Sequence, residues 1–300
     1  MDGGDIKKGH YRKKHCSPKK GKLSYSCLSS EILYKIAKAL NKLDDININY
    51  KQLDDKQLYD EICNTIQSNF NCKTEACWLN IRKLMMNLSK KDAKYFREYF
   101  RPKMPEEIVK DYTEWISNFD IESVLDQYHN DLDDFYFYGA VPRDFRKCSV
   151  SELCKINISK HLNNGETKLG IVFNTDDSDG DGEHWNAMYI DLIGTNLDGQ
   201  PGIYFFDSFG SRPFKEVKQL IKKIEKQGKK KDIEFIVSHN EKAFQRNTYA
   251  CGFYCIHFIE HMIMGYPFKK YIKSGLTDKK MKEYQRHCYL HPDEIKIPKN

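Results

Sequence analysis

Residues 251–264 read CGFYCIHFIEHMIM, a long and mostly apolar run that ends at Gly265. A helix that is apolar on nearly every side belongs in a protein interior. Glycine is common directly after the last turn of a helix. The sequence therefore predicts a buried helix here, with Cys251 in its first turn.

Short strand-like runs precede this helix. They are rich in aromatic and β-branched residues and lie at residues 169–174, 184–193, 202–206 and 233–238. A helical pattern covers 213–227, between the last two runs, and a polar helix is expected at 277–289. Because the strands do not alternate simply with helices, we expect an α+β domain with a central mixed sheet flanked by helices.

The first 130 residues have a different texture. Apolar residues recur there at helical spacing, in segments at 28–40, 57–70, 76–88 and 106–128. The N-terminal stretch is polar, and residues 7–22 are rich in Lys and Arg without any acid. We therefore expect a basic flexible arm over 1–26, a helical N-terminal domain over 27–130 and the mixed domain over 131–300.

Composition limits the classes of protein that fit. No run of about 18 apolar residues is present, so no membrane span is expected. The N-terminus has no apolar core and is not a secretory signal. Ten cysteines without regular spacing fit reduced thiols in a cytosol-like compartment. The basic arm could contact nucleic acid or an acidic partner, although a solvated tail is the more common meaning of such a run.

Four elements of the mixed domain suit a thiol hydrolase. A helix N-terminus stabilises an anion, which favours a thiolate at Cys251. His184, at the start of a strand, could take the thiol proton, and Asp207, at the end of the next strand, could orient that imidazole. The side chain of Gln245 and the backbone N–H of Cys251 could bind an oxyanion.

Each of these residues also has a structural interpretation. A lone His in a strand, an Asp in a turn, a Gln in a loop or a buried Cys is usually not catalytic. His239 is the rival for the base. Asp191 is the rival for the acid, but seven residues of extended strand separate it from His184 by over ~20 Å. The arrangement of all four elements together therefore carries the hypothesis.

Metal sites are not expected. The run Asp177, Asp179, Asp181 and Gly182 begins like a calcium loop, but Met188 stands where the bidentate Glu should fall. His10, His15, Cys16 and Cys27 fit no zinc-finger spacing. No metal or other cofactor is predicted.

The stretches GEHWNAMYIDLI, IYFFDSFG and QRNTYACGFYCIHFI resemble the ubiquitin-like-protein protease superfamily, which includes the SUMO-specific and adenovirus proteases. The order His, Asp, Gln, Cys is the order of that family. KLGIVFNTDDSDGDGEHW and LTDKKMKEYQRHCY are similar to the branch of large DNA viruses of the African swine fever virus type. One departure is Ala250, because SUMO-type members usually have an acidic residue before the nucleophile.

The resemblance implies a papain-like-superfamily cysteine protease core and the catalytic set His184, Asp207, Gln245 and Cys251. It also implies cleavage of viral polyproteins or structural precursors after small pairs such as Gly-Gly or Ala-Gly, during virion maturation. Trp185 would floor a narrow cleft, and Gly252 would let the substrate backbone approach. We expect protein substrates, and a location in the virion and host cytoplasm rather than secretion.

Two other functions stay open. The same site could serve an isopeptidase that removes SUMO or other ubiquitin-like tags. In a different class, the chain could be a non-catalytic packaging protein that binds nucleic acid and keeps a relic site. A thiol-reactive probe that labels only Cys251 separates an enzyme from a relic.

Overall fold

The computed structural model describes residues 15–196 and 199–297. The chain divides into two compact units, one formed by residues up to Met104 together with those from Arg286, and the other by Pro105–Gln285. This division differs from the expected boundary at residue 130. The reason is α6 (Asn118–Asp131), whose buried residues pack against β1 and α9 of the mixed domain.

The first unit is helical, as expected for this part of the chain. Its elements are α1 (Ser30–Leu40), α2 (Asp55–Phe70), the 3-10 helix η1 (Glu75–Asn80), α3 (Arg82–Asn87), α4 (Lys90–Glu98) and α12 (Pro292–Ile295). Side chains cap these helices: Ser29 accepts from the Ile32 N–H, and Asp54 and Gln57 form a capping box. Their apolar faces share one buried cluster.

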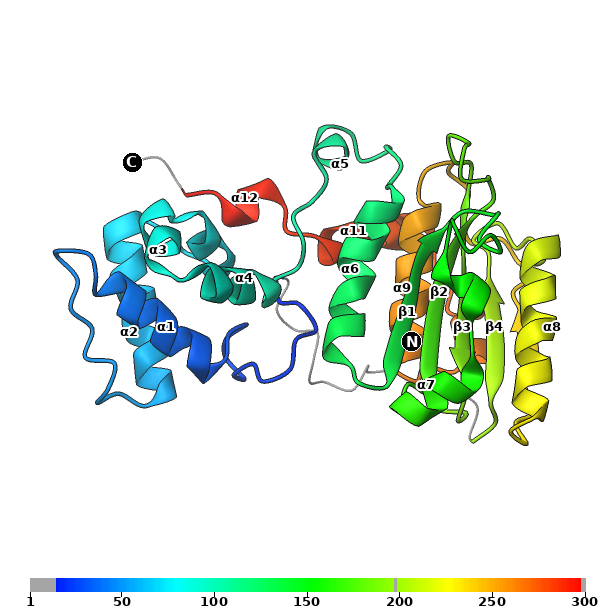
Figure 1. Cartoon of the computed structure of the whole chain (residues 1–300). Coiled ribbons are helices and arrows are strands. Elements are labelled where there is room, and N and C mark those ends of the chain that lie inside the picture. Colours follow the sequence, from blue (N-terminus) through cyan, green and yellow to red (C-terminus); the bar gives the residue numbers. More distant parts are fainter. Residues whose placement is uncertain (1–14, 197–198, 298–300) are drawn as a thin grey trace. The chain divides into compact units, whose positions relative to one another are not determined.

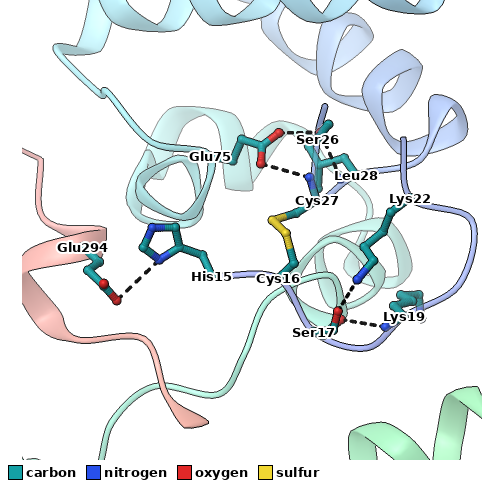
Figure 2. Close-up of a disulfide and its surroundings, with 10 residues drawn as sticks. All are labelled: His15, Cys16, Ser17, Lys19, Lys22, Ser26, Cys27, Leu28, Glu75 and Glu294. Carbon is teal, nitrogen blue, oxygen red and sulfur yellow. Dashed lines mark hydrogen bonds and ion pairs between the residues drawn. A yellow bond between two sulfur atoms is a disulfide. The ribbon is translucent and has the colours of Figure 1, made fainter. Parts of the chain in front are cut away.

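Residues 15–26 belong to this unit, so the predicted flexible arm is wrong for them. A disulfide joins Cys16 to Cys27 (Figure 2). The Glu75 carboxylate accepts from the Cys27 N–H at 3.0 Å and from the Ser26 hydroxyl. These bonds fix the segment because they tie its backbone to η1. Residues 1–14 of the predicted arm lie outside the described residues.

The second unit contains a five-stranded mixed sheet in the order β1-β2-β3-β4-β5 (Figure 1). The strands are β1 (Phe135–Val141), β2 (Lys168–Asn174), β3 (Trp185–Asp191), β4 (Gly202–Phe206) and β5 (Ile236–His239). β1 is parallel to β2, β4 is parallel to β5, and β3 is antiparallel to both its neighbours. The expected α+β class with a central mixed sheet is confirmed.

Helices cover both faces of this sheet (Figure 1). α9 (Cys251–Ile263) packs against β3 and β2, while α8 (Lys215–Lys229) shares a buried cluster with the other face. The remaining helices are α5 (Glu106–Lys110), η2 (Glu152–Lys155), α7 (Ile158–Asn164), α10 (Phe268–Tyr271) and α11 (Asp278–Cys288). Burial on both faces explains why β2, β3 and β4 read as continuous apolar runs.

The expectation of reduced thiols is wrong for six cysteines. Disulfides also join Cys72 to Cys77 and Cys148 to Cys154. Each pair is close in sequence, and local chain turns bring the Cα atoms to 5.8 and 5.3 Å, inside the range that a disulfide spans. Across the described residues, no helix has both the length and the apolar character needed to cross a bilayer.

Candidate active site

The register of two neighbouring strands brings the predicted base and acid together. β3 and β4 are antiparallel, and Ala187 pairs with Phe206. His184 directly precedes β3, and Asp207 directly follows β4. Antiparallel strands place the start of one beside the end of the next, so both side chains lie at the same sheet edge.

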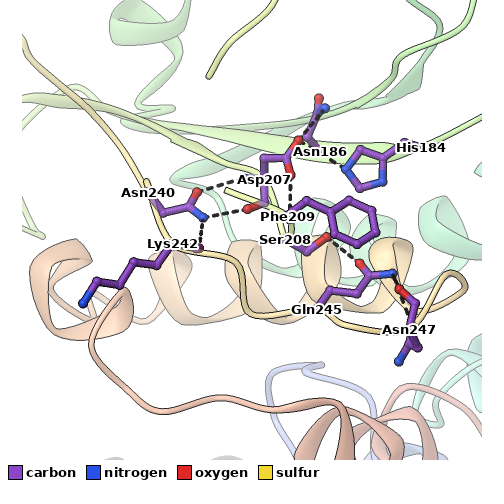
Figure 3. A network of polar contacts seen from close by, with 9 residues as sticks. All are labelled: His184, Asn186, Asp207, Ser208, Phe209, Asn240, Lys242, Gln245 and Asn247. Carbon is purple, nitrogen blue, oxygen red and sulfur yellow. Dashed lines mark hydrogen bonds and ion pairs between the residues drawn. The ribbon is translucent and has the colours of Figure 1, made fainter. Parts of the chain in front are cut away.

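His184 faces the Asp207 carboxylate, with Nε2 lying 3.2 Å from Oδ2 (Figure 3). The imidazole is only 16% exposed. Burial disfavours the imidazolium, but the hydrogen bonds to Asp207 and Cys251 outweigh it and raise the pKa of His184 to about 9. Because Nε2 meets the carboxylate, Nδ1 is the nitrogen that remains for the thiol. The structure therefore brings His184, Asp207 and Cys251 into one interacting set.

Cys251 is the first residue of α9, as the apolar pattern predicts. It is 2% exposed, and no side chain caps this helix N-terminus. The uncapped N–H groups of the first turn give this end of α9 a partial positive charge. Cys255 lies one turn further along, fully buried, and burial raises the pKa of its thiol well above the ordinary value. Of these two cysteines, Cys251 is the one that interacts with His184.

Three further residues hold Asp207 in place (Figure 3). The buried Asn240 carboxamide accepts from the Asp207 N–H at 2.9 Å and donates to the Asp207 carbonyl at 2.6 Å. The Phe209 N–H donates to Oδ1 at 2.7 Å, and its ring lies over the His184 ring with centroids 4.9 Å apart. Asn186 donates to Oδ2 at 3.5 Å. The sequence alone did not single out these residues.

A chain of hydrogen bonds links the acid to the loop before the nucleophile. Ser208, the residue after Asp207, donates to Gln245 Oε1 at 2.6 Å. Gln245 Nε2 donates to the Asn247 carbonyl at 3.0 Å and lies 3.2 Å from Asn247 Oδ1. Asn247 Oδ1 also accepts from the Ala250 N–H, directly before Cys251. Gln245 is therefore buried next to the set, with its NH2 group turned to Asn247.

Asp278 anchors this loop from α11. Its Oδ2 accepts from the backbone N–H groups of Arg246 and Asn247, each at 3.0 Å. Its Oδ1 accepts from the Tyr254 hydroxyl at 2.9 Å, and burial together with this bond raises the pKa of that phenol. A carboxylate that accepts three hydrogen bonds restrains the backbone between Gln245 and Cys251.

A cavity of about 600 Å³ opens beside Trp185, the residue that follows His184 in the chain; His184 itself is not among the residues that line it. Trp185 lines it, and the indole N–H of this mostly buried side chain donates to the Ile116 carbonyl at 3.1 Å. Trp115, which is 48% exposed, lines the same cavity. The helical pattern at 106–128 suggested that Trp115 belongs to another domain. Only the tertiary structure shows that Trp115 lies near Trp185, because the Trp185 indole donates to the carbonyl of Ile116, the next residue in the chain.

Gly252 has a packing role that the sequence did not indicate. A Cβ on this glycine would lie 2.5 Å from Cγ1 of Ile116 and 3.4 Å from Cδ1 of Ile121. The missing side chain therefore makes room for a core contact with the segment leading into α6. Whether it also lets a substrate backbone approach stays a prediction.

The rival residues lie elsewhere. His239 pairs with Phe205 at the end of β5, and no contact among the described residues joins it to Cys251. Asp191 is fully buried and accepts from the backbone of the turn after β3, including the Gly194 N–H at 2.7 Å. Asp191 therefore has a structural role, and His239 is a residue of strand β5.

Two histidines of α9 form part of the core. The rings of His257 and His261 stack with centroids 3.9 Å apart, and burial lowers the pKa of both. Glu260, between them in sequence, accepts from the Tyr128 hydroxyl instead. Over residues 15–196 and 199–297, no three His, Cys, Asp or Glu side chains gather as metal ligands would.

Part of the chain is similar to known proteases. Residues 169–297 match the model of the Ulp1 protease family, C-terminal catalytic domain. A relative from Acanthamoeba polyphaga mimivirus, whose name includes the term thiol protease, is 33% identical over 166 residues. That match covers 55% of this chain and 53% of the relative, so the chain spans about half of the mimivirus protein.

A second group of relatives comes from African swine fever virus. Its SUMO-1 cysteine protease is 24% identical over 193 residues, which is 58% of this chain and 67% of the relative. A crystal structure of a protease from the same virus superposes with a TM-score of 0.65 at 19% identity, over 92% of this chain and 96% of the other. At this identity the superposition shows a shared fold. The likeness to the Ulp1 protease family, C-terminal catalytic domain, thus lies in residues 169–297, while the shared fold extends over most of the chain.

Proposed function

We propose that the chain is a cysteine endopeptidase, with Cys251 as nucleophile, His184 as general base and acid, and Asp207 as the orienting carboxylate. The observation that carries the proposal is that one mostly buried imidazole interacts with both Asp207 and Cys251. The pKa of about 9 for His184 keeps the imidazole protonated at neutral pH, which favours a thiolate–imidazolium pair.

The chemistry follows from this pair. The Cys251 thiolate attacks the scissile carbonyl carbon, and the resulting tetrahedral intermediate collapses as the C–N bond breaks. The His184 imidazolium gives its proton to the leaving amine. Water then hydrolyses the thioester, with the neutral imidazole as base. No step needs a cofactor.

The oxyanion needs donors near the start of α9. The Cys251 N–H is one candidate, since no side chain caps this helix. Gln245 is the second, provided that one hydrogen of its NH2 group turns from Asn247 towards the cleft when substrate binds. Losing one such donor typically costs about 3 kcal/mol of barrier.

We propose that the substrates are viral precursors cut after Gly-Gly or Ala-Gly pairs, in maturing virions or the host cytoplasm. Two observations support this proposal. The relatives named as proteases come from large DNA viruses. Trp185, the residue after His184, and Trp115 line one cavity, and their rings leave most room there for residues without large side chains. The basic segment 7–22 remains a candidate for nucleic-acid contact.

The test compares three linear peptides that differ only at the residue before the scissile bond: Gly, Ala or Leu. The Gly peptide should be cleaved fastest. Cys251→Ser and His184→Ala should each lose cleavage by at least ~10³-fold while keeping the melting temperature. Equal cleavage rates for the three peptides would refute the proposed specificity. Cleavage by Cys251→Ser at the wild-type rate would refute the assignment of Cys251 as nucleophile.

One further arm separates the alternatives. A SUMO-conjugated protein carries an isopeptide bond, whereas a precursor carries a linear Gly-Gly site. Faster release from the conjugate would favour the isopeptidase. A vinyl sulfone peptide that fails to label Cys251 under reducing conditions would favour the non-catalytic packaging protein.

A further inference from the structure

The outer face of α8 carries positive charge that the catalytic site does not use. Lysines recur at three- and four-residue steps along one side of the helix and form what we call the lysine row: Lys215, Lys218, Lys222, Lys226 and Lys229. All five are exposed, whereas the opposite side of the helix is buried against the sheet. Every exposed residue of α8 is Lys or Gln.

Acidic residues do not neutralise the row. Within the described part of the chain, none of its lysines forms an ion pair with a carboxylate, and Glu216 of the same helix pairs with Arg143 at 3.3 Å. Residues 215–231 contain eight lysines and two acids, whereas the rest of 105–285 contains 16 basic and 27 acidic residues. Positive charge is therefore concentrated on one helix of an otherwise acidic unit.

A pocket of about 250 Å³ lies beside the row, lined by Arg146, Gln219 and Lys223 among others. Lys223 Nζ donates to the Cys154 carbonyl at 2.7 Å, and the Arg146 guanidinium donates to the Gln219 side chain. Both partners are neutral. Burial and the charge of Arg146 lower the pKa of Lys223, so two cations share this pocket without a carboxylate. Such a pair favours an anionic ligand.

The shape of the row indicates the kind of polyanion. Its ends lie 14 residues apart, or about 21 Å along a helix. Duplex DNA presents one negative charge for about every 1.7 Å of its axis, which matches a continuous row better than isolated acidic side chains do. The row has no aromatic or apolar side chain that could stack on a base or enter a bilayer. We infer that the lysine row and the Arg146–Lys223 pocket bind the phosphate backbone of nucleic acid without sequence preference.

The test measures binding of a labelled duplex of about 20 base pairs to the full chain by fluorescence anisotropy, between about 50 and 200 mM salt. The row variant carries Gln at three positions: Lys218, Lys222 and Lys226. A matched control carries Gln at three exposed lysines elsewhere: Lys269, Lys270 and Lys273. A third variant carries Gln at five basic residues of the N-terminal stretch: Lys7, Lys8, Arg12, Lys13 and Lys14.

The row variant should bind about tenfold or more weaker than wild type, and the slope of log K against log salt should fall by about 3. Melting temperature and Cys251 labelling should not change, because the side chains of the row are exposed and α8 covers the sheet face opposite α9. An equal loss of duplex affinity in the row variant and the matched control would overturn the inference. So would a complete loss of affinity in the N-terminal variant together with an unchanged affinity in the row variant.

Two additional probes test the class of ligand. Polyglutamate and vesicles with anionic lipid carry negative charge without a nucleic-acid backbone. They should bind wild type more weakly than the duplex at the same salt. Equal or tighter binding of either probe, with the same loss in the row variant, would overturn the assignment to nucleic acid.

Discussion

Replacing Asp207 by Asn tests the central feature of the site, which is the charge that holds His184 protonated. The substitution keeps the size of the side chain and leaves the backbone groups that Asn240 holds. It removes the negative charge from the atom that lies 3.2 Å from His184 Nε2. The pKa of His184 should therefore fall.

The structure sets the size of this fall. The rise of the His184 pKa from 6.5 to about 9 corresponds to about 3 kcal/mol in favour of the imidazolium. Burial acts against this form, so Asp207 and Cys251 together contribute more than the net value. A carboxylate at this distance typically shifts a pKa by about one to three units, so the value in Asp207→Asn should lie at roughly 6 to 8.

The assay is an NMR titration of histidine Cε1–H signals in ¹³C-labelled protein, with His184 assigned by its absence in His184→Gln. The matched control is Glu183→Gln, which removes an exposed carboxylate next to His184 in sequence. A pKa that stays near 9 in Asp207→Asn would refute the role of the carboxylate. An equal fall in Glu183→Gln would refute it too, because general charge rather than the hydrogen bond would then be responsible.

Three further predictions concern the surroundings of the pair. Asp278→Ala should lower kcat by about tenfold or more, because the loop with the oxyanion donors loses its anchor. KM and the rate at which iodoacetamide alkylates Cys251 should stay within about twofold of wild type. A parallel fall in the alkylation rate would contradict this role. Gly252→Ala should lower the free energy of unfolding in urea by about 1–3 kcal/mol, because the added Cβ would overlap Ile116. Adding Ile116→Val should recover part of this loss. An unchanged free energy of unfolding in Gly252→Ala would contradict the packing. Because the folded pKa of His184 exceeds its unfolded value, its stabilising contribution is complete below about pH 6.5 and lost as pH rises through about 9. Wild type should therefore lose about 3 kcal/mol more than His184→Gln over this range, and parallel pH curves would refute the linkage.

Local patterns predicted most of the elements, because apolar spacing reports which side of a segment is buried. The runs at 169–174, 202–206 and 251–264 became β2, β4 and α9 within one residue at each end. Helix α4 was missed, since its only buried residues are Ala93 and Phe96. The segment 133–145, whose Gly and Pro favour a loop or short strand, contains β1, because its aromatic residues fill the edge of the sheet next to α6.

The sequence was less informative about thiols and the domain boundary. Cys148 and Cys154 are only six residues apart, and nothing in that spacing distinguishes a disulfide from two reduced thiols. Likewise, α6 has the amphipathic pattern of any surface helix, so its pattern cannot tell which core it covers. Which thiol a cysteine bonds to, and which core a helix covers, are decided only when the whole unit has folded.

The sequence by itself determined the chemical groups and their order along the chain: a cysteine opening a buried helix, a histidine before one strand and an aspartate after the next. Strand order and helix polarity follow from local pattern, so these groups could be named in advance. Only the tertiary structure decided that Nε2 of His184 meets Asp207, that Ile116 fills the space beside Gly252, and that Asn240 and Asp278 brace the site. Hydrogen bonds and close contacts act over a few ångströms, and residues far apart in sequence reach that range only after the chain has folded.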